Sequence, residues 1–145
     1  MPMQGQYEPS PWKIVADQVA LYEATAGAEG GTLQGKPVVI LSARGRHSGK
    51  VRKTPLMRVE HNGTYAVVAS MGGAPKHPVW YLNLITSPTV MLQDGPNVYD
   101  VRPREVQGDE KARWWALAVA AWPAYAEYQA KTERQIPVVV REPIG

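Results

Sequence analysis

The sequence contains no cysteine. This absence excludes disulfide bonds, thiolate nucleophiles, zinc sites built on thiolates and iron–sulfur clusters. Long hydrophobic runs are also missing, since the longest apolar stretch extends from Trp114 to Ala126 and is interrupted by Pro123. A membrane-spanning helix needs about 20 apolar residues, so none is expected. The first residues lack the basic segment and apolar core of a secretory signal, which makes a cytoplasmic protein the default expectation.

Charge of either sign is sparse. The 145 residues carry a formal net charge of +3, and 44% of them are hydrophobic while 20% are charged. This composition is typical of a single globular domain. The small positive excess favours an anionic ligand over nucleic acid, because the basic residues are few and lack interleaved exposed aromatic side chains. Neither a Walker phosphate loop nor a dinucleotide-binding glycine fingerprint is present.

Helical patterns occur near both ends and in the middle of the chain. The predicted helices cover residues 11–26, 78–85, 109–122 and 123–134. Ser10 and Asp109 are the expected N-caps of the first and third helices, and Pro78 fits a first helical position, where no amide hydrogen is needed. Residues 1–10 are rich in proline, glycine and glutamine and are expected to form a flexible N-terminal tail.

Alternating and short apolar runs predict about six strands. They cover residues 37–41, 54–60, 64–70, 89–93, 97–104 and 136–141. Asn62-Gly63 and Asp94-Gly95 predict tight hairpins, because these residues tolerate the positive φ angles of such turns. The expected fold class is therefore α+β, a small and mostly antiparallel β-barrel with covering helices. Residues 1–145 show no repeat or boundary and are predicted to form one domain.

A basic turn lies between the first two predicted strands, from Arg44 to Lys53. Gly45 and Gly49 allow the backbone to approach a ligand and to turn its amides inward as an anion-binding nest. Arg46 and Arg52 can each donate two hydrogen bonds to a phosphate or carboxylate. The alternative is a solvated, charged hairpin loop that keeps a sheet edge soluble.

A second unusual stretch covers residues 69–83, where a predicted strand ends at Gly72-Gly73 and two prolines precede a helix. Glycines at a strand end suit a flat ring lying against the backbone, and a helix N-terminus offers partial positive charge. The alternative is a rigid strand-to-helix connection with core aromatic residues.

Together the two stretches resemble the deazaflavin-dependent nitroreductases and F420H2-dependent quinone reductases of actinobacteria. The first family motif, Gly-Arg-x-Ser-Gly-x-x-Arg followed by Thr-Pro-Leu, matches Gly45 to Leu56. The second, Gly-Gly-x-Pro-x-His-Pro-x-Trp-Tyr-x-Asn-Leu, matches Gly72 to Leu84. The stretch from Tyr125 to Val138 is also similar to the family, and the likeness covers essentially everything from Pro37 to Pro143.

The resemblance implies a split β-barrel that binds coenzyme F420 and needs no metal. Its reduced form would donate hydride to a quinone, menaquinone-like, or to a nitroaromatic or nitroimidazole acceptor. The residues expected to contact the cofactor are Arg46, His47, Ser48, Arg52, Lys53, Thr54, Pro55, Leu56, Met57, Val68, Ala69, Ser70, Met71, Val79, Trp80, Tyr81, Leu82 and Asn83. His47 stands where the family often has lysine.

The acceptor side is implied by the same resemblance. The family's substrate-side aromatic residues correspond to Trp122, Tyr125 and Tyr128, with Trp122 at a position where tyrosine is common. Ser70 and Tyr125 are the catalytic candidates, expected to hydrogen-bond the acceptor oxygen or to relay a proton. The alternative for these aromatic residues is packing of a helix against the barrel. A lipid quinone would fit a weak peripheral contact with the inner face of the cell membrane.

Other functions fit the same barrel. FMN or haem could replace F420, although the basic turn argues for a longer anionic tail than FMN carries. A non-catalytic carrier that binds F420 without turnover is the second alternative. The sequence leaves the oligomeric state open, and a homodimer is among the options.

Overall fold

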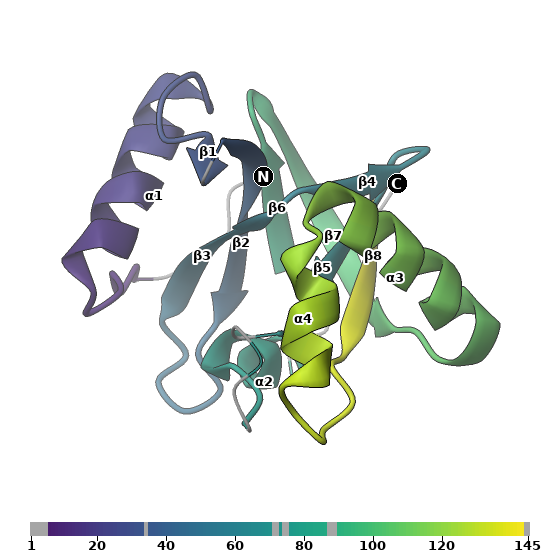
Figure 1. Cartoon of the computed structure of the whole chain (residues 1–145). Helices are drawn as coiled ribbons and strands as arrows, with labels where there is room; N and C mark the ends of the chain where they lie inside the picture. Colours follow the sequence, from purple (N-terminus) through teal and green to yellow (C-terminus); the bar gives the residue numbers. More distant parts are fainter. Residues whose placement is uncertain (1–5, 34, 71–72, 74–75, 87–89, 144–145) are drawn as a thin grey trace.

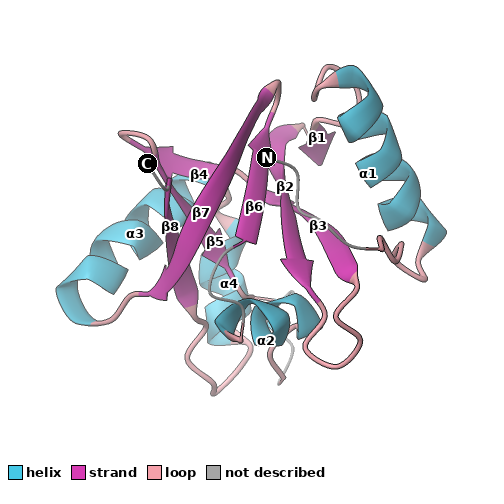
Figure 2. Cartoon of the chain, turned by 180° about the vertical axis from the view of Figure 1, so that it is seen from behind, coloured by secondary structure: helices cyan, strands magenta, loops and turns pink. Residues whose placement is uncertain are grey.

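The computed structural model describes residues 6–33, 35–70, 73, 76–86 and 90–143, which form a curled sheet covered by helices (Figure 1). The elements in chain order are α1 (Lys13–Thr25), β1 (Thr32–Leu33), β2 (Lys36–Arg44), β3 (Val51–Met57), β4 (Val59–His61), β5 (Thr64–Val68), α2 (Val79–Ile85), β6 (Val90–Asp94), β7 (Asn97–Glu105), α3 (Gly108–Ala121), α4 (Ala124–Ala130) and β8 (Val138–Pro143). In this view helix α1 lies at the left of the sheet and α3 and α4 lie at the right, and residues of all three helices pack in one hydrophobic cluster. Seen from behind, α2 lies at one end of the strands (Figure 2).

The sheet curls into a barrel because residues 51–61 pair with strands at two different places in it, with β2 as strand β3 and with β5 as strand β4. The strand order is β1-β2-β6-β7-β8-β5-β4, with β3 paired to β2, and the pairs are antiparallel. Only Arg58 separates β3 from β4, so the chain leaves β2 and joins β5 at the opposite end of the sheet. This half-open barrel with helical cover confirms the predicted α+β split-barrel class.

The bend between β3 and β4 is held by Arg58. Its backbone N–H donates to the carbonyl oxygen of Pro37 at 3.0 Å. Its Nε lies 3.1 and 3.0 Å from the two carboxylate oxygens of Asp94, in the hairpin between β6 and β7. The Tyr65 hydroxyl of β5 donates to the same carboxylate at 2.6 Å. The Asp94 carboxylate therefore connects the bend to the β6–β7 hairpin and to β5.

Two hydrophobic clusters lie on opposite faces of the sheet. Alternate residues of β2 separate between them, Val38 and Ile40 to one and Val39 and Leu41 to the other. The first, the outer cluster, includes residues of α1, α3 and α4; the second, the inner cluster, includes residues of β5 to β8 and α2. Both faces of β2 are buried, which explains its nearly continuous apolar sequence.

Several predicted boundaries are corrected. The strand expected over residues 54–60 is two strands, because the bend at Arg58 changes its partner, and β1 was not predicted. The described residues therefore contain eight strands rather than about six. The last strand is shifted to residues 138–143. The Asn62-Gly63 and Asp94-Gly95 hairpins are confirmed by the pairs His61↔Thr64 and Asp94↔Asn97.

The predicted helix starts are wrong by small amounts. Helix α1 begins after Trp12, and the Ser10 hydroxyl accepts the Trp12 amide at 3.2 Å instead of capping the helix. Helix α3 begins after Gln107, so Asp109 lies in its first turn. Pro78 is the N-cap of α2 rather than its first residue. The last helix is shorter than predicted, since α4 ends at Ala130.

The expected flexible tail is only partly described. Residues 1–5 lie outside the described residues, whereas Tyr7 forms a parallel bridge with Val51 of β3. The Gln6 carbonyl accepts the Val51 amide at 2.8 Å, and the Glu8 amide donates to the Val51 carbonyl at 2.9 Å. Residues 6–8 therefore extend the sheet beside the start of β3.

Removing the charge of Asp94 tests the anchoring of the bend. We expect Asp94→Asn to lower the free energy of unfolding by about 1 to 2 kcal/mol, because charge-assisted hydrogen bonds from Arg58 and Tyr65 are weakened. The lower part of the usual range applies because 35% of the Arg58 side chain is exposed. Urea unfolding measures the change, with exposed Glu133→Gln as the control; equal stability of both variants would contradict the anchor.

Candidate cofactor site

The outer edge of β3 carries backbone groups that do not face β2. The Gly45 amide donates to Lys50 O and the Arg58 amide to Pro37 O, so even-numbered residues of this strand face β2. Val51 instead bonds outward, to residues 6 and 8. By this alternation the backbone groups of Lys53, Pro55 and Met57 point outward. Within the described ranges no backbone partner meets them, and proline fits the middle position because it has no amide hydrogen.

Ser70 follows the end of β5 and is brought to the outer face of the sheet. Val68 belongs to the outer cluster and Ala69 to the inner one, so the alternation places the Ser70 side chain on the outer face. The Ala69 amide still donates to Pro137 O at 3.0 Å, which continues the pairing beyond the strand. Ser70 is 7% exposed, and its hydroxyl has no hydrogen-bond partner in the described part of the chain.

Gly73, beyond the end of β5, lies close against helix α4. Its φ is +83°, and a Cβ built there would lie 2.7 Å from the carbonyl oxygen and 3.1 Å from the Cα of Tyr128. Only glycine combines this left-handed conformation with such a close approach to another backbone. Gly73, the second glycine of the sequence motif, is therefore the docking point for α4, the helix that carries the predicted residues Tyr125 and Tyr128.

The aromatic residues of this helix meet one another in the structure. Tyr125 is 5% exposed, and its ring lies 6.1 Å from that of Tyr128 and 6.3 Å from that of Trp115. Tyr128 and Trp122 pack against the outer cluster, but Trp122 is extended and lies between α3 and α4 rather than in a helix. Burial, with a smaller contribution from Tyr128, raises the pKa of the Tyr125 hydroxyl. This hydroxyl is therefore protonated at neutral pH, and no described residue hydrogen-bonds to it.

The basic turn contacts the helix of the second motif. Arg46, His47 and Ser48 are exposed at the turn between β2 and β3. The Arg46 amide donates to Asn83 Oδ1 at 3.0 Å, and Asn83 itself is 5% exposed. The Ser48 hydroxyl accepts the Lys50 amide at 3.1 Å. The two sequence motifs therefore contact each other. The Asn83 side chain orients the basic turn by accepting a hydrogen bond from the main chain of Arg46.

Two further basic residues of the turn, Arg52 and Lys53, contact the N-terminal part of the chain. Arg52 lies 3.2 Å from a carboxylate oxygen of Glu8, and Lys53 lies 2.5 Å from one of Glu23. The Lys53 ammonium also sits 4.8 Å from the centre of the Tyr7 ring. These acidic and aromatic partners were missed from the sequence, because residues so far apart give no local signal of proximity.

The remaining predicted cofactor residues have mixed surroundings. Leu56, Trp80 and Leu82 pack against the inner cluster and Tyr81 belongs to it, whereas Val79 is 67% exposed. The Tyr81 hydroxyl donates to Glu105, and burial together with this hydrogen bond raises the pKa of Tyr81 to about 12. Thr54 and Pro55 are half-buried, Met57 belongs to the outer cluster, and Met71 lies outside the described residues.

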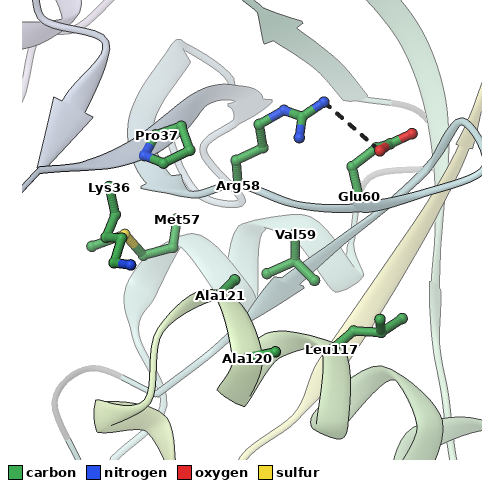
Figure 3. Close-up of a pocket in the computed structure, with 9 residues that line it drawn as sticks. All are labelled: Lys36, Pro37, Met57, Arg58, Val59, Glu60, Leu117, Ala120 and Ala121. Atoms are coloured by element: carbon green, nitrogen blue, oxygen red, sulfur yellow. Dashed lines mark ion pairs between the residues drawn. The ribbon is translucent and has the colours of Figure 1, made fainter.

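A cavity of 320 Å³ lies beside the bend, between β3, β4 and α3 (Figure 3). Its lining residues are Lys36, Pro37, Met57, Arg58, Val59, Glu60, Leu117, Ala120 and Ala121. Of the predicted site residues it includes Met57 alone, so it is separate from Ser70, Tyr125 and the basic turn. Arg58 is already engaged by Asp94 at its rim.

Among the described residues, no group of three or more His, Asp or Glu side chains could hold a metal ion. Among the helices of the same residues, none has both the length and the apolar character needed to cross a bilayer.

The architecture is that of the split-barrel oxidoreductases, and the comparisons with known proteins make the class specific. Residues 14–143 match the model of the F420H(2)-dependent quinone reductase family. The F420H(2)-dependent quinone reductase Rv1261c of Mycobacterium tuberculosis is 35% identical over 125 residues, which are 83% of this chain and 84% of that protein. The chain therefore belongs to the F420H(2)-dependent quinone reductase family.

Solved structures agree with this assignment. An F420-H2 dependent reductase, FDR-A, is 56% identical with a TM-score of 0.70, covering 73% of this chain and 94% of that one. A second structure, described as a domain-swapped dimer, is 49% identical with a TM-score of 0.72, covering 92% of this chain and 100% of the other.

Substitution of Gly73 tests its role as the docking point. We expect Gly73→Ala to lower the free energy of unfolding by roughly 2 to 4 kcal/mol, because left-handed strain and a clash with Tyr128 add together. Gly63→Ala is a matched control, since its φ is +82° with no atom within 4 Å of the added Cβ. The control should cost only about 1 kcal/mol. Equal losses in urea unfolding would contradict the close packing.

Proposed function

We propose that this chain transfers hydride from reduced F420 to a quinone, with the reaction located between the outer edge of β3 and the residues Ser70 and Tyr125. The dependence on F420 follows from the family to which the chain belongs. The observation that carries the location is the outer cluster, to which Met57, Val68 and Tyr125 belong, beside backbone groups of β3 that have no backbone partner among the described residues. A menaquinone-like molecule is the acceptor class that we favour, and nitroaromatic or nitroimidazole compounds are a second class.

The described residues fit such a cofactor. Outward amides and carbonyls between Lys53 and Met57 offer hydrogen bonds to a polar ring edge and its side chain, as an exposed strand edge does for a peptide. Arg46, His47 and Arg52 stand at the basic turn, where they would hold a phosphate and an acidic tail. When bound, reduced F420 supplies the hydride, and the protein supplies binding, orientation and exclusion of water.

The hydroxyls of Tyr125 and Ser70 fit the acceptor side. Each is nearly buried and has no hydrogen-bond partner among the residues described. A buried hydroxyl without a partner costs about 1 to 3 kcal/mol, so a ligand oxygen that accepts from it recovers part of this free energy. We propose that Tyr125 donates to the acceptor oxygen, with Ser70 beside it, and that Trp122 and Tyr128 form apolar walls around the quinone ring.

Assembly and membrane contact are separate parts of the proposal. The domain-swapped dimer among the similar structures supports a homodimer as the state to test for this chain. Trp12 and Ile14 at the start of α1 are 69% and 80% exposed, which supports a weak peripheral contact with a membrane that contains the quinone. Analytical ultracentrifugation and vesicle flotation test these two points independently of turnover.

Binding and turnover measurements distinguish this function from its rivals. Quenching of F420 fluorescence should give tight binding of oxidised F420 and much weaker binding of FMN. Reoxidation of reduced F420 by menadione should be accelerated by the protein. Binding of FMN alone would replace the cofactor assignment, and F420 binding without acceleration would indicate a carrier.

Arg52→Ala tests the role of the basic turn. We expect the Kd for oxidised F420 to rise roughly fivefold at low salt, since a partly exposed charge contact contributes about 1 kcal/mol, and the effect should shrink at high salt. Arg113→Ala removes the same charge from exposed α3 and should leave the Kd unchanged. An equal Kd for Arg52→Ala and wild type would count against the assignment.

Tyr125→Phe tests the proposed donor. We expect kcat with menadione to fall roughly tenfold, as for the loss of one hydrogen bond made to the reacting molecule, while the Kd for F420 stays within twofold. Tyr99→Phe removes a hydroxyl from a partly buried tyrosine beside the inner cluster and serves as the matched control. Full activity of the Tyr125 variant would exclude the hydroxyl as a donor.

A further inference from the structure

Arg134 reaches back from the segment after α4 to the segment that follows β5. Its Nη1 donates to the Ala69 carbonyl at 3.0 Å, and its Nη2 donates to the Ser70 carbonyl at 2.7 Å. The Ser70 carbonyl also accepts the Gly73 amide at 2.9 Å. The Ser70 carbonyl is therefore held by two donors, the Arg134 guanidinium and the Gly73 amide.

The same guanidinium contacts a third group, the imidazole of His77. Arg134 Nη1 lies 3.0 Å from His77 Nδ1. Because arginine only donates hydrogen bonds, Nδ1 must accept, and the ring proton is therefore on Nε2 of a neutral imidazole. The arginine thus determines the tautomer of this histidine.

His77 passes this constraint to helix α2. Its ring lies 4.9 Å from the ring of Tyr81, tilted by 50°. The Tyr81 hydroxyl donates to Glu105 of β7, whose other carboxylate oxygen accepts Gln107 Nε2 at 2.9 Å. A continuous series of contacts therefore runs from Arg134 through His77 to the first turn of α2 and on to the barrel wall.

We propose that Arg134 is a positioning residue, which fixes the end of β5 and the start of α2 relative to each other so that both can contact the cofactor. This inference rests on the proposed function, because both segments are expected cofactor contacts. Arginine suits the role since its planar fork can serve two carbonyls and a ring nitrogen at once, whereas lysine has a single donor atom. Burial lowers the pKa of Arg134, but an arginine keeps its charge in proteins.

The test compares Arg134→Ala with Arg134→Lys and with the exposed control Arg113→Ala. We expect the alanine variant to raise the Kd for oxidised F420 by roughly tenfold to a hundredfold, as misplacement of a site by about an ångström does. Lysine should restore only part of the affinity. Millimolar guanidinium should restore affinity to Arg134→Ala, but change neither the wild type nor Arg113→Ala. A folded Arg134→Ala variant with wild-type Kd would overturn the proposal.

A second measurement does not depend on F420. Nitrogen chemical shifts of His77 in the wild-type protein should show the Nε2–H tautomer, and a proton on Nδ1 would overturn the proposed contact. If wild-type protein bound no F420, the proposed function would fail while this readout still tested the arginine. If Arg134→Ala did not fold, His77→Phe would decide, since it keeps the ring beside Tyr81 without the acceptor. A raised Kd would support the coupling, and an unchanged Kd would contradict it.

Discussion

The bend at Arg58 is the constraint on which the rest of this structure depends. At this residue the chain stops pairing with β2 and starts pairing with β5. Residues 51–61 therefore connect the two parts of the sheet, while the outer edge of β3 has no neighbouring strand among the described residues. The Arg58–Asp94 pair fixes the bend, and Tyr65 joins the same carboxylate. Had residues 51–61 continued as one straight strand along β2, residues 59–61 would not pair with β5.

The site that we propose at the split has little dedicated side-chain chemistry. The outward backbone of β3 offers donors and acceptors, and Gly73, beyond the end of β5, lies close against α4. Ser70 and Tyr125 add two nearly buried hydroxyls without partners in the described residues. A hydride transfer needs orientation and a dry surface more than it needs ionised catalytic groups, and we propose that this arrangement provides both.

The sequence predicted the elements well where local chemistry decides them. The Asn62-Gly63 hairpin and the apolar face of α1 with Val19 and Tyr22 follow from turn and helix rules. The bend at Arg58 was missed, because residues 54–60 have one uninterrupted strand pattern and the change of partner is tertiary. The motifs at the basic turn and at Gly72 to Leu84 led to the correct family. The ion pair of Lys53 with Glu23 and the hydrogen bond from Arg134 to the Ser70 carbonyl join residues far apart in the chain, so the sequence pattern could not predict them.

We propose that F420 binds along the outer edge of β3. Amide hydrogen exchange resolved at single residues, with and without oxidised F420, measures whether the cofactor covers this edge. The amides of Lys53 and Met57 should exchange rapidly in the free protein and become protected on binding, while those of Arg52 and Thr54, which face β2, should be protected in both states. Saturating F420 that leaves the exchange of Lys53 and Met57 unchanged would contradict the account.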